Sequence, residues 1–563
     1  MRSEPQGAAP LLPLASMLTV ATLLTLFVLR SLDDNKLTSW RWVFAPEDAW
    51  RLLLCLVLAV LLAHLAGALA LQPLRPAPVL FAGAFASTAL LWSEPEVIVD
   101  AARHFAQAKH IASYGIADFF NAWGGELSAW TDLPLMPLVY GALFSLLGEE
   151  RIYVQACNSL LFAGTVVLTW QIGRMLWDET IGSIAAALLL GMPYLLVQVP
   201  LTLVDVPTMF FATLASFAAL AALRHGGWAR IVFAAAAIAL AFFSKYSAWL
   251  MLTILPVLAL VEARGRPAAV WRRAGAIAGG ALLLIGPALL PMADVVGAQL
   301  VLLRDYQAPG LARWEESFAS TLLFQSHPFI AIAAAVSLWL AWRARDGRYA
   351  VIAWLPLLML ALGIRRARYL VPMLPMLALM AAYGLQAIRS PALRRHVVLC
   401  TVASSLAIVY FGFLPFLQRT SAVNLKLAGA YLDTLETEAV EVVALPQARA
   451  SVNAEIAVPL LDLHTAKRVV SRALQAPAPP DVARLPLRFT WEYRNPAIYG
   501  AGIRTAGPLP VAVIAGRGEE SLPPWLAQRL AHHRLSREFT VSENVFGYQT
   551  LVSVYLPAAA DGD

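Results

Sequence analysis

Charged residues are scarce in this chain. They make up only 14% of its 563 residues, whereas 59% are hydrophobic, a balance that excludes an ordinary soluble globular protein. Cysteine is also rare: Cys55, Cys157 and Cys400 all fall in apolar runs, so no disulfide framework is expected. The net charge of +6 does not indicate binding to nucleic acid, because the arginines stand in short loops between apolar runs.

The apolar residues form successive runs of about 20, a length that crosses a bilayer as a helix. We therefore predict a mainly α, polytopic helical membrane protein with about thirteen spans. Arg2 precedes a first run without a small-residue cleavage site, so we interpret that run as a retained span. The predicted spans are residues 9–30, 50–71, 76–92, 152–176, 181–199, 206–223, 229–243, 247–262, 274–291, 328–342, 349–364, 369–388 and 397–417.

The loop arginines predict the orientation. With a cytoplasmic N-terminus, most of them fall on the cytoplasmic side, as the positive-inside rule requires. This orientation places residues 93–150 and the C-terminal region outside the cytoplasm and predicts a multi-pass protein of the inner (plasma) membrane. The arginines concerned are Arg75, Arg174, Arg224, Arg230, Arg264, Arg266, Arg272, Arg273, Arg343, Arg345, Arg348, Arg389, Arg394 and Arg395.

Composition divides the chain into four predicted parts. Residues 1–92 hold the N-terminal spans, 93–150 form an outer-face catalytic loop with periplasmic juxtamembrane helices, and 151–417 form the remaining transmembrane core. Residues 418–563 change in composition and predict a small extracytoplasmic α/β domain. Its expected strands are 440–445, 456–461, 511–514 and 550–556, with helices from 424 and near 524–532.

The long polar loop 92–137 concentrates acids between hydrophobic spans. Carboxylates at a membrane surface cost desolvation energy, so such a cluster indicates a site. Pro95 suits a helix start, and a helix over 96–111 would gather its polar residues on one water-facing side, with its apolar side in lipid or protein. The acids of the loop are Glu94, Glu96, Asp100, Asp118, Glu126 and Asp132, and the polar helix face comprises Glu96, Asp100, Arg103, His104, Gln107 and His110.

Further charges fall on the same predicted outer side. Asp205 interrupts an apolar stretch at a span end, where an acid is costly. Lys245 is a cation between two short spans, although simple snorkelling would also explain it. Arg365, Arg366 and Arg368 break the positive-inside rule; they are either a stray basic loop or a site for an anionic headgroup or phosphate. A carboxylate base with a phosphate clamp suits transfer from a lipid-phosphate donor.

Five stretches, taken in order, resemble one known family: SEPEVIVDAARHFAQAKH, TDLPLMPLVYGALFSLLG, LVDVPTMFF, FFSKYSAW and RRARYLVPMLPM. The chain is similar, over residues 92–388, to the GT-C class of polyprenyl-phosphate-sugar-dependent glycosyltransferases. This class includes protein O-mannosyltransferases and the aminoarabinose transferase of lipid A. The resemblance implies inverting transfer of one sugar, hexosyl or pentosyl, from polyprenyl phosphate to a lipid, glycan or protein acceptor outside the cytoplasm.

The resemblance also implies site residues. The base would be Glu94, Glu96 or Asp100, with Glu94 favoured by register because the family motif begins Asp-Glu where this chain has Glu94 and Pro95. Asp205 would orient the acceptor or polarise the base. Asp132, with His104, is a candidate for acceptor or metal binding; it replaces the family's Lys or His and leaves open whether a divalent cation takes part. The residues expected to hold the donor phosphate are Lys245, Arg365, Arg366, Arg368 and Tyr369.

Two other functions fit part of the pattern. A membrane transporter or lipid flippase also carries charge within the membrane, but it should show charged or broken spans at corresponding positions of two halves. The charges here gather instead in outer loops of unequal length. A ligase for polyprenyl-pyrophosphate glycans would use the arginine cluster similarly but should lack the acidic first-loop helix.

Overall fold

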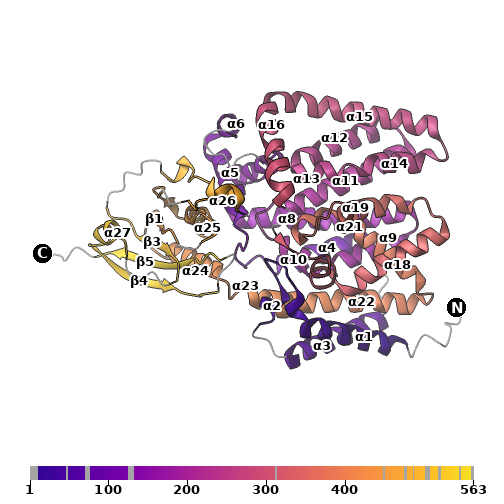
Figure 1. Ribbon diagram of the computed structural model, residues 1–563, viewed down its shortest axis with the longest axis horizontal. Helices are drawn as coiled ribbons and strands as arrows, with labels where there is room; N and C mark the ends of the chain where they lie inside the picture. The colour runs from indigo at the N-terminus through magenta and orange to yellow at the C-terminus, as the bar shows by residue number, and fades with distance from the viewer. Residues whose placement is uncertain are drawn as a thin grey trace.

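The computed structural model describes residues 11–45, 49–69, 76–124, 132–310, 314–447, 450–474, 478–485, 487–500, 507–517, 522–543 and 547–558. Glu126, Arg2 and Arg75 lie outside these residues. A large body of roughly aligned helices carries a smaller domain at one end, which contains the C-terminal strands (Figure 1). The predicted fold class, a polytopic helical membrane protein with a small C-terminal α/β domain, is confirmed.

Within the described residues, eight helical segments are long and apolar enough to cross a membrane, and six shorter apolar helices accompany them. The helices of this body are α1 Leu11–Val28, α3 Ala49–Ala68, α4 Pro76–Ala89, α7 Leu135–Leu147, α8 Arg151–Leu176, α9 Glu179–Leu189, α10 Pro193–Gln198, α11 Asp205–His225, α12 Trp228–Ser244, α13 Tyr246–Met251, α14 Ile254–Ala263, α15 Pro267–Leu289, α16 Ala293–Leu302, α18 Pro328–Ala344, α19 Tyr349–Ala361, α20 Ala367–Leu370, α21 Leu374–Gly384, α22 Pro391–Ile408 and α23 Leu414–Leu417. Short segments complete it: η1 Arg30–Leu32, α2 Trp40–Val43, η2 Leu290–Met292, η3 Leu303–Gln307, α17 Ala308–Gly310, η5 Ser320–Ser326, η6 Val371–Met373, η7 Leu385–Ala387 and η8 Val409–Phe413.

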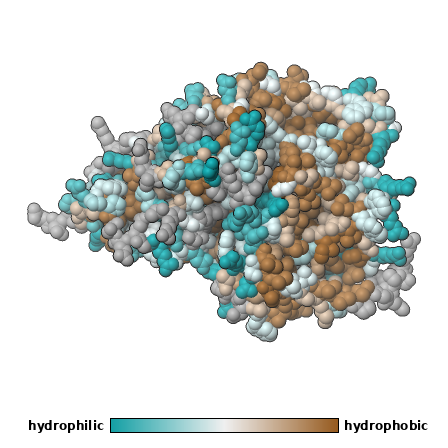
Figure 2. All heavy atoms as spheres, viewed as in Figure 1, coloured by the Kyte–Doolittle hydropathy of each residue, from teal (hydrophilic) through white to brown (hydrophobic). Residues whose placement is uncertain are grey.

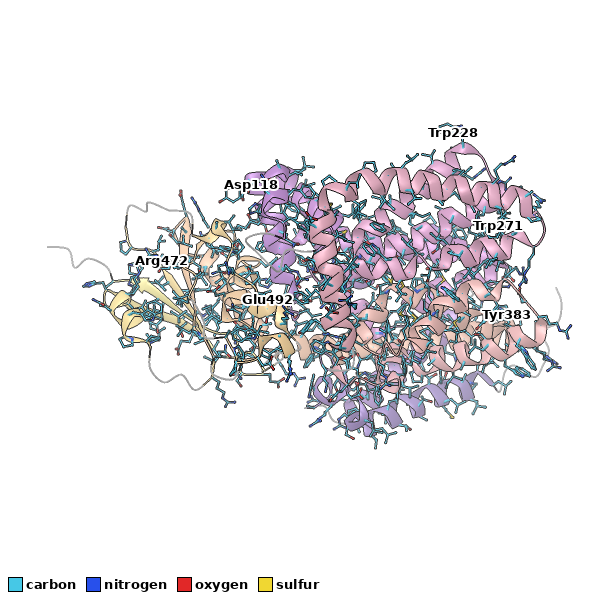
Figure 3. All side chains as sticks on the ribbon, turned by 45° about the horizontal axis from the view of Figure 1, so that its top comes forward. Asp118, Trp228, Trp271, Tyr383, Arg472 and Glu492 are labelled. Atoms are coloured by element: carbon cyan, nitrogen blue, oxygen red, sulfur yellow. The ribbon has the colours of Figure 1, made fainter. Side chains whose placement is uncertain are left out.

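The surface of the helical body carries a broad hydrophobic band with hydrophilic residues on both sides of it (Figure 2). Trp228 and Trp271 are exposed and lie toward the end of the body that faces away from the C-terminal domain (Figure 3). Tryptophan is enriched at membrane–water interfaces, because its ring is apolar and its N–H is polar. The band and these tryptophans fit a multi-pass membrane protein.

One predicted span is divided in the structure. The sequence predicts a single helix over 181–199, but α9 ends at Leu189 and α10 begins at Pro193. Pro193 occupies the first position of α10, where its missing N–H costs nothing. The residue before a proline is disfavoured in the α conformation, so the chain breaks at Met192.

The first outer loop forms two helices, α5 Asp100–Tyr114 and α6 Ile116–Ala122, before α7. The predicted start at Glu96 is wrong, since α5 begins four residues later at Asp100. The expected water-facing polar side is also wrong: His104 and Gln107 are as deeply buried as Phe105 on the opposite side. The reason is tertiary, because α7 packs against one side of α5 and the C-terminal domain against another.

The C-terminal domain is a five-stranded mixed sheet with strand order β2-β1-β3-β5-β4, in which β1 is parallel to β2 and β3, and β5 is antiparallel to β3 and β4. Its strands are β1 Ala439–Ala444, β2 Arg468–Val470, β3 Val511–Ala515, β4 His533–Phe539 and β5 Leu551–Pro557. Its helices are α24 Ala422–Asp433, η9 Ala454–Ile456, α25 Ala457–Asp462, η10 Val482–Arg484, α26 Arg488–Trp491, η11 Ala497–Tyr499 and α27 Pro524–Arg529.

The strand predicted over 456–461 is wrong, because Ile456 ends η9 and the residues after it form α25. The Asn453 side chain accepts a hydrogen bond from Glu455 N just before it and starts the helical turn. Pro459 stands in the first turn of α25, where a proline is tolerated. The helix then packs against α5, so the apolar run is buried without joining the sheet.

Candidate active site

A cavity of about 370 Å³ lies where the helical body, α5 and the C-terminal domain meet. Its walls combine apolar residues with a group of charged side chains. The charged lining residues are Asp100, Arg103, Asp132, Lys245, Arg366 and Arg368, and the C-terminal domain contributes Leu487, Phe489 and Thr490. Residues more than 250 positions apart in the sequence therefore form one chamber.

A chain of ion pairs links the lining residues Asp100, Arg368 and Lys245 through Asp205, which does not itself line the cavity. Arg368 donates from Nη1 to Asp100 Oδ2 at 2.6 Å and from Nε to Asp205 Oδ2 at 2.9 Å. Lys245 Nζ lies 2.5 Å from the other oxygen of Asp205. Asp205 is buried with both oxygens occupied, whereas the Asp100 side chain keeps a quarter of its surface exposed. Asp100 is therefore the accessible carboxylate of this group.

Asp100 is held in its ionised form. Burial raises the pKa of this carboxyl, but the positive charges of Arg368 and Arg103 outweigh burial and bring its pKa well below the usual range. Asp100 is thus an ionised carboxylate at neutral pH. Its position at the first turn of α5 adds a favourable interaction with the helix dipole.

A second group lies beside the first on the same helix. Arg103 donates to both oxygens of Asp132, with the shorter contact at 2.6 Å, and Gln107 Nε2 donates to Asp132 at 3.3 Å. His104 Nδ1 lies 3.9 Å from Asp132, too far for a hydrogen bond. Burial lowers the pKa of His104 to about 4, so its ring is neutral at physiological pH.

Arg366 differs from the other cations of the cavity. Its guanidinium stacks on Trp314 at 3.4 Å from the ring centroid, and Nη1 lies 3.4 Å from the Tyr369 hydroxyl. Among the described residues no carboxylate lies within ion-pair distance of Arg366, and its buried Nε has no hydrogen-bond partner. Glu316 instead fixes the backbone beside it by accepting from Ala367 N at 3.0 Å and from Lys36 N at 3.2 Å. Arg366 is thus a cation held in place by stacking on Trp314, and its N–H donors bind no described carboxylate.

The structure does not bring every expected site residue to the cavity. Glu94 is buried and accepts from Gln418 Nε2 at 3.0 Å at the start of the C-terminal region, so the structure does not support it as the base. Glu96 accepts from Arg151, from Thr202 N and from the Thr202 hydroxyl at 2.8–2.9 Å, which gives it a structural role. Arg365 is exposed with its guanidinium 5.7 Å from the Phe318 ring. The expected residues that do line the cavity are Asp100, His104, Asp132, Lys245, Arg366, Arg368 and Tyr369.

Sequence reasoning missed several lining residues. Trp314, Tyr246 and Gln299 come from segments that read as ordinary loop or span. The charged Lys245, which precedes Tyr246 in the sequence, could have indicated that Tyr246 belongs to the site. The sequence around Trp314 and Gln299 carries no such signal. Among the described residues, no group of three or more His, Cys, Asp and Glu side chains is arranged to hold a metal ion.

Residues 132–290 match the family described as dolichyl-phosphate-mannose-protein mannosyltransferase. The structure resembles the crystal structure of ArnT from Cupriavidus metallidurans bound to undecaprenyl phosphate, with a TM-score of 0.54 and 14% identity over 86% of this chain and 98% of that chain.

The apo state of the same ArnT gives a TM-score of 0.50 and 13% identity over 85% of this chain and 98% of that one. The fold is therefore similar to that of ArnT. Among curated proteins, no match to this chain was found. The resemblance of the sequence to GT-C glycosyltransferases thus extends to the fold.

Proposed function

We propose that this protein is an integral-membrane glycosyltransferase that moves one sugar from a polyprenyl-phosphate donor to a hydroxyl of an extracytoplasmic acceptor. The observation that carries the proposal is that an accessible, ionised carboxylate, Asp100, shares one cavity with Arg366, a cation that forms no ion pair with any described residue. The family match over residues 132–290 and the similarity to an ArnT that binds undecaprenyl phosphate support it.

In the proposed reaction, Asp100 accepts the proton of the acceptor hydroxyl. The oxygen of this hydroxyl attacks the anomeric carbon of the donor sugar at the same time. The bond between that carbon and the phosphate oxygen breaks, and the lipid phosphate leaves with the electron pair. Direct displacement of this kind inverts the anomeric configuration. Arg366, assisted by Lys245, stabilises the growing negative charge on the phosphate. Asp205 orients Arg368 and Lys245 without contacting substrate.

The charges around the cavity fit an anionic donor. The cavity lining contains four cations, Arg103, Lys245, Arg366 and Arg368. Asp100, Asp132 and Asp205 form ion pairs with three of them, and the buried Glu316 interacts with Arg366 only at longer range. The guanidinium of Arg366 is therefore the group that is placed to bind a phosphate.

The proposal is tested by neutralising carboxylates one at a time in purified protein in nanodiscs. We expect Asp100→Asn to reduce release of lipid phosphate from polyprenyl-phosphate hexose donors by at least about 100-fold, because the general base is lost. Binding of the donor should persist, since Arg366 is unchanged. Glu94→Gln is the matched control from the same loop and should keep its activity. Full activity of Asp100→Asn would overturn the proposed base.

A further inference from the structure

Three polar side chains that line the cavity have buried atoms without a hydrogen-bond partner. They are both ring nitrogens of His104, the hydroxyl of Tyr246 and Oε1 of Gln299. His104 is 1% exposed and Gln299 6% exposed. A buried polar group that lacks a partner is destabilising, so several around one cavity indicate that a ligand supplies the partners.

These side chains come from three separate elements that line the cavity. His104 lies on α5, Tyr246 begins α13, and Gln299 lies on α16. Tyr246 packs against the apolar cluster that contains Leu133 and Val296, and Val296 lies one turn before Gln299 on α16. The unpartnered atoms are thus fixed by packing and not by flexible loops.

The three side chains are uncharged, and together they offer both hydrogen-bond donors and hydrogen-bond acceptors. The pKa of about 4 keeps His104 uncharged, so its ring presents one donor and one acceptor. The Tyr246 hydroxyl donates and accepts, and Gln299 Oε1 only accepts. Hydroxyl groups complement this mixture because each of them also donates and accepts. An ammonium group only donates and a carboxylate only accepts, so either would leave part of the wall unsatisfied.

The charges nearby leave nothing to neutralise a charged sugar. Asp132 stands beside His104, but Arg103 already occupies both of its oxygens. Because Arg103 and Asp132 are paired with each other, neither is free to neutralise a charged sugar.

We propose that His104, Tyr246 and Gln299 form a subsite for a neutral, polyhydroxylated donor sugar and that this subsite discriminates against amino sugars and sugar acids. The inference rests on the proposed function and specifies its donor. A site built to bond hydroxyls rejects analogues that lack them, because its own buried polar groups then stay unpaired.

Binding of short-chain donor analogues to the full-length protein tests the subsite. The probes are citronellyl phosphodiesters of glucose, mannose, 4-amino-4-deoxyarabinose and glucuronic acid, with citronellyl methyl phosphate as the sugar-free diester of equal charge. We expect glucose or mannose to bind at least about tenfold more tightly than the methyl diester, and the two charged sugars to show no such gain.

A matched pair of variants locates the effect. Tyr246→Phe and Tyr194→Phe each remove one buried hydroxyl that lacks a partner, but only Tyr246 lines the cavity. Tyr246→Phe and Gln299→Leu should each reduce the gain for the neutral sugar by about 3- to 10-fold while affinity for the methyl diester is unchanged. Tyr194→Phe should leave both affinities as in the wild type.

The outcomes separate the two proposals. A charged sugar that binds more tightly than glucose and mannose overturns the inference but leaves the transferase proposal intact. Loss of affinity for the methyl diester in Tyr246→Phe also overturns it, because the tyrosine would then serve the phosphate. If no probe binds, including the methyl diester, the proposed donor class fails and the subsite fails with it.

Discussion

Buried carboxylates in this protein differ in what neutralises them. Asp205 has Lys245 and Arg368, and Glu96 has Arg151. Glu455, in the C-terminal domain, is 7% exposed and makes no ion pair with any described residue. Burial raises the pKa of Glu455 to about 7, a shift that a hydrogen bond from the backbone of Asn495 partly opposes. This residue is therefore a titrating group inside a folded domain.

The titration of Glu455 predicts a pH-dependent stability. Its pKa is about 7 in the folded state and near the ordinary 4.5 when unfolded, so its contribution is full below pH 4.5 and is lost as the pH rises to about 7. The loss amounts to at most about 3 kcal/mol. Thermal unfolding at pH 5 and pH 8 should show Glu455→Gln losing less stability than the wild type over this interval.

Glu438→Gln, which removes an exposed carboxylate from the same domain, is the control and should follow the wild type. Parallel pH profiles for the wild type and Glu455→Gln would show that Glu455 ionises normally. The variant is compared with the wild type at each pH because His104 also affects stability, with the opposite dependence on pH. The lowered pKa of His104 costs stability as the pH falls from 6.5 toward 4 in both proteins.

At the scale of single elements, α5 connects the cavity to the C-terminal domain. Asp100 and Arg103 on its first turn face the cavity. Nine residues beyond Asp100, Lys109 lies 2.7 Å from Asp462 of α25 and 2.6 Å from Glu149. The Tyr499 hydroxyl donates to the same oxygen of Asp462. This buried cluster fixes α5 against the domain and thereby the position of Asp100.

Removing the cation of this cluster should destabilise the protein strongly. Lys109→Met leaves the buried Asp462 without a compensating charge, which typically costs about 3–5 kcal/mol. Arg529→Met is the control, since it breaks an exposed pair with Glu441 that is worth less than about 1 kcal/mol. Thermal unfolding of the two variants in the same detergent compares them. Equal losses would mean that the cluster does not hold the domain.

At the scale of the whole molecule, one end of the helical body bears the cavity, α5 and the C-terminal domain, and the other bears exposed tryptophans (Figures 1 and 3). Arg174 and Arg224 stand in the last turns of α8 and α11. Arg348 precedes α19. These are among the arginines that the positive-inside rule assigns to the cytoplasm. The N-terminus should therefore be cytoplasmic and the C-terminal domain extracytoplasmic.

Reporter fusions test this orientation. A periplasmic phosphatase joined after Gln418 should be active, and one joined after Arg266, between α14 and α15, should be inactive. The opposite pattern would place the cavity in the cytoplasm. It would then contradict the orientation and the extracytoplasmic acceptor together.

The sequence by itself determined the membrane architecture and the segments that supply the site. Runs of apolar residues specify spans locally, because a helix in lipid satisfies its own backbone hydrogen bonds. The runs at 440–445, 511–514 and 550–556 specified strands in the same local way, and they correspond to β1, β3 and β5. The misplaced charges of Lys245 and Arg365–Arg368 pointed to two loops that contribute residues to the cavity, because charge near a membrane is costly wherever it occurs.

Only the tertiary structure decided which of these residues meet. Asp100 and Arg368 are 268 positions apart, and no local pattern fixes the contact between them. Glu94 and Asp100 look alike in sequence, but Glu94 packs against Gln418 whereas Asp100 faces the cavity. The residues at 456–461 became helical because Asn453 caps the 3₁₀ turn that leads into α25 and because α5 buries this helix. Packing between distant segments selects among local possibilities that differ little in energy, which is why the sequence left them open.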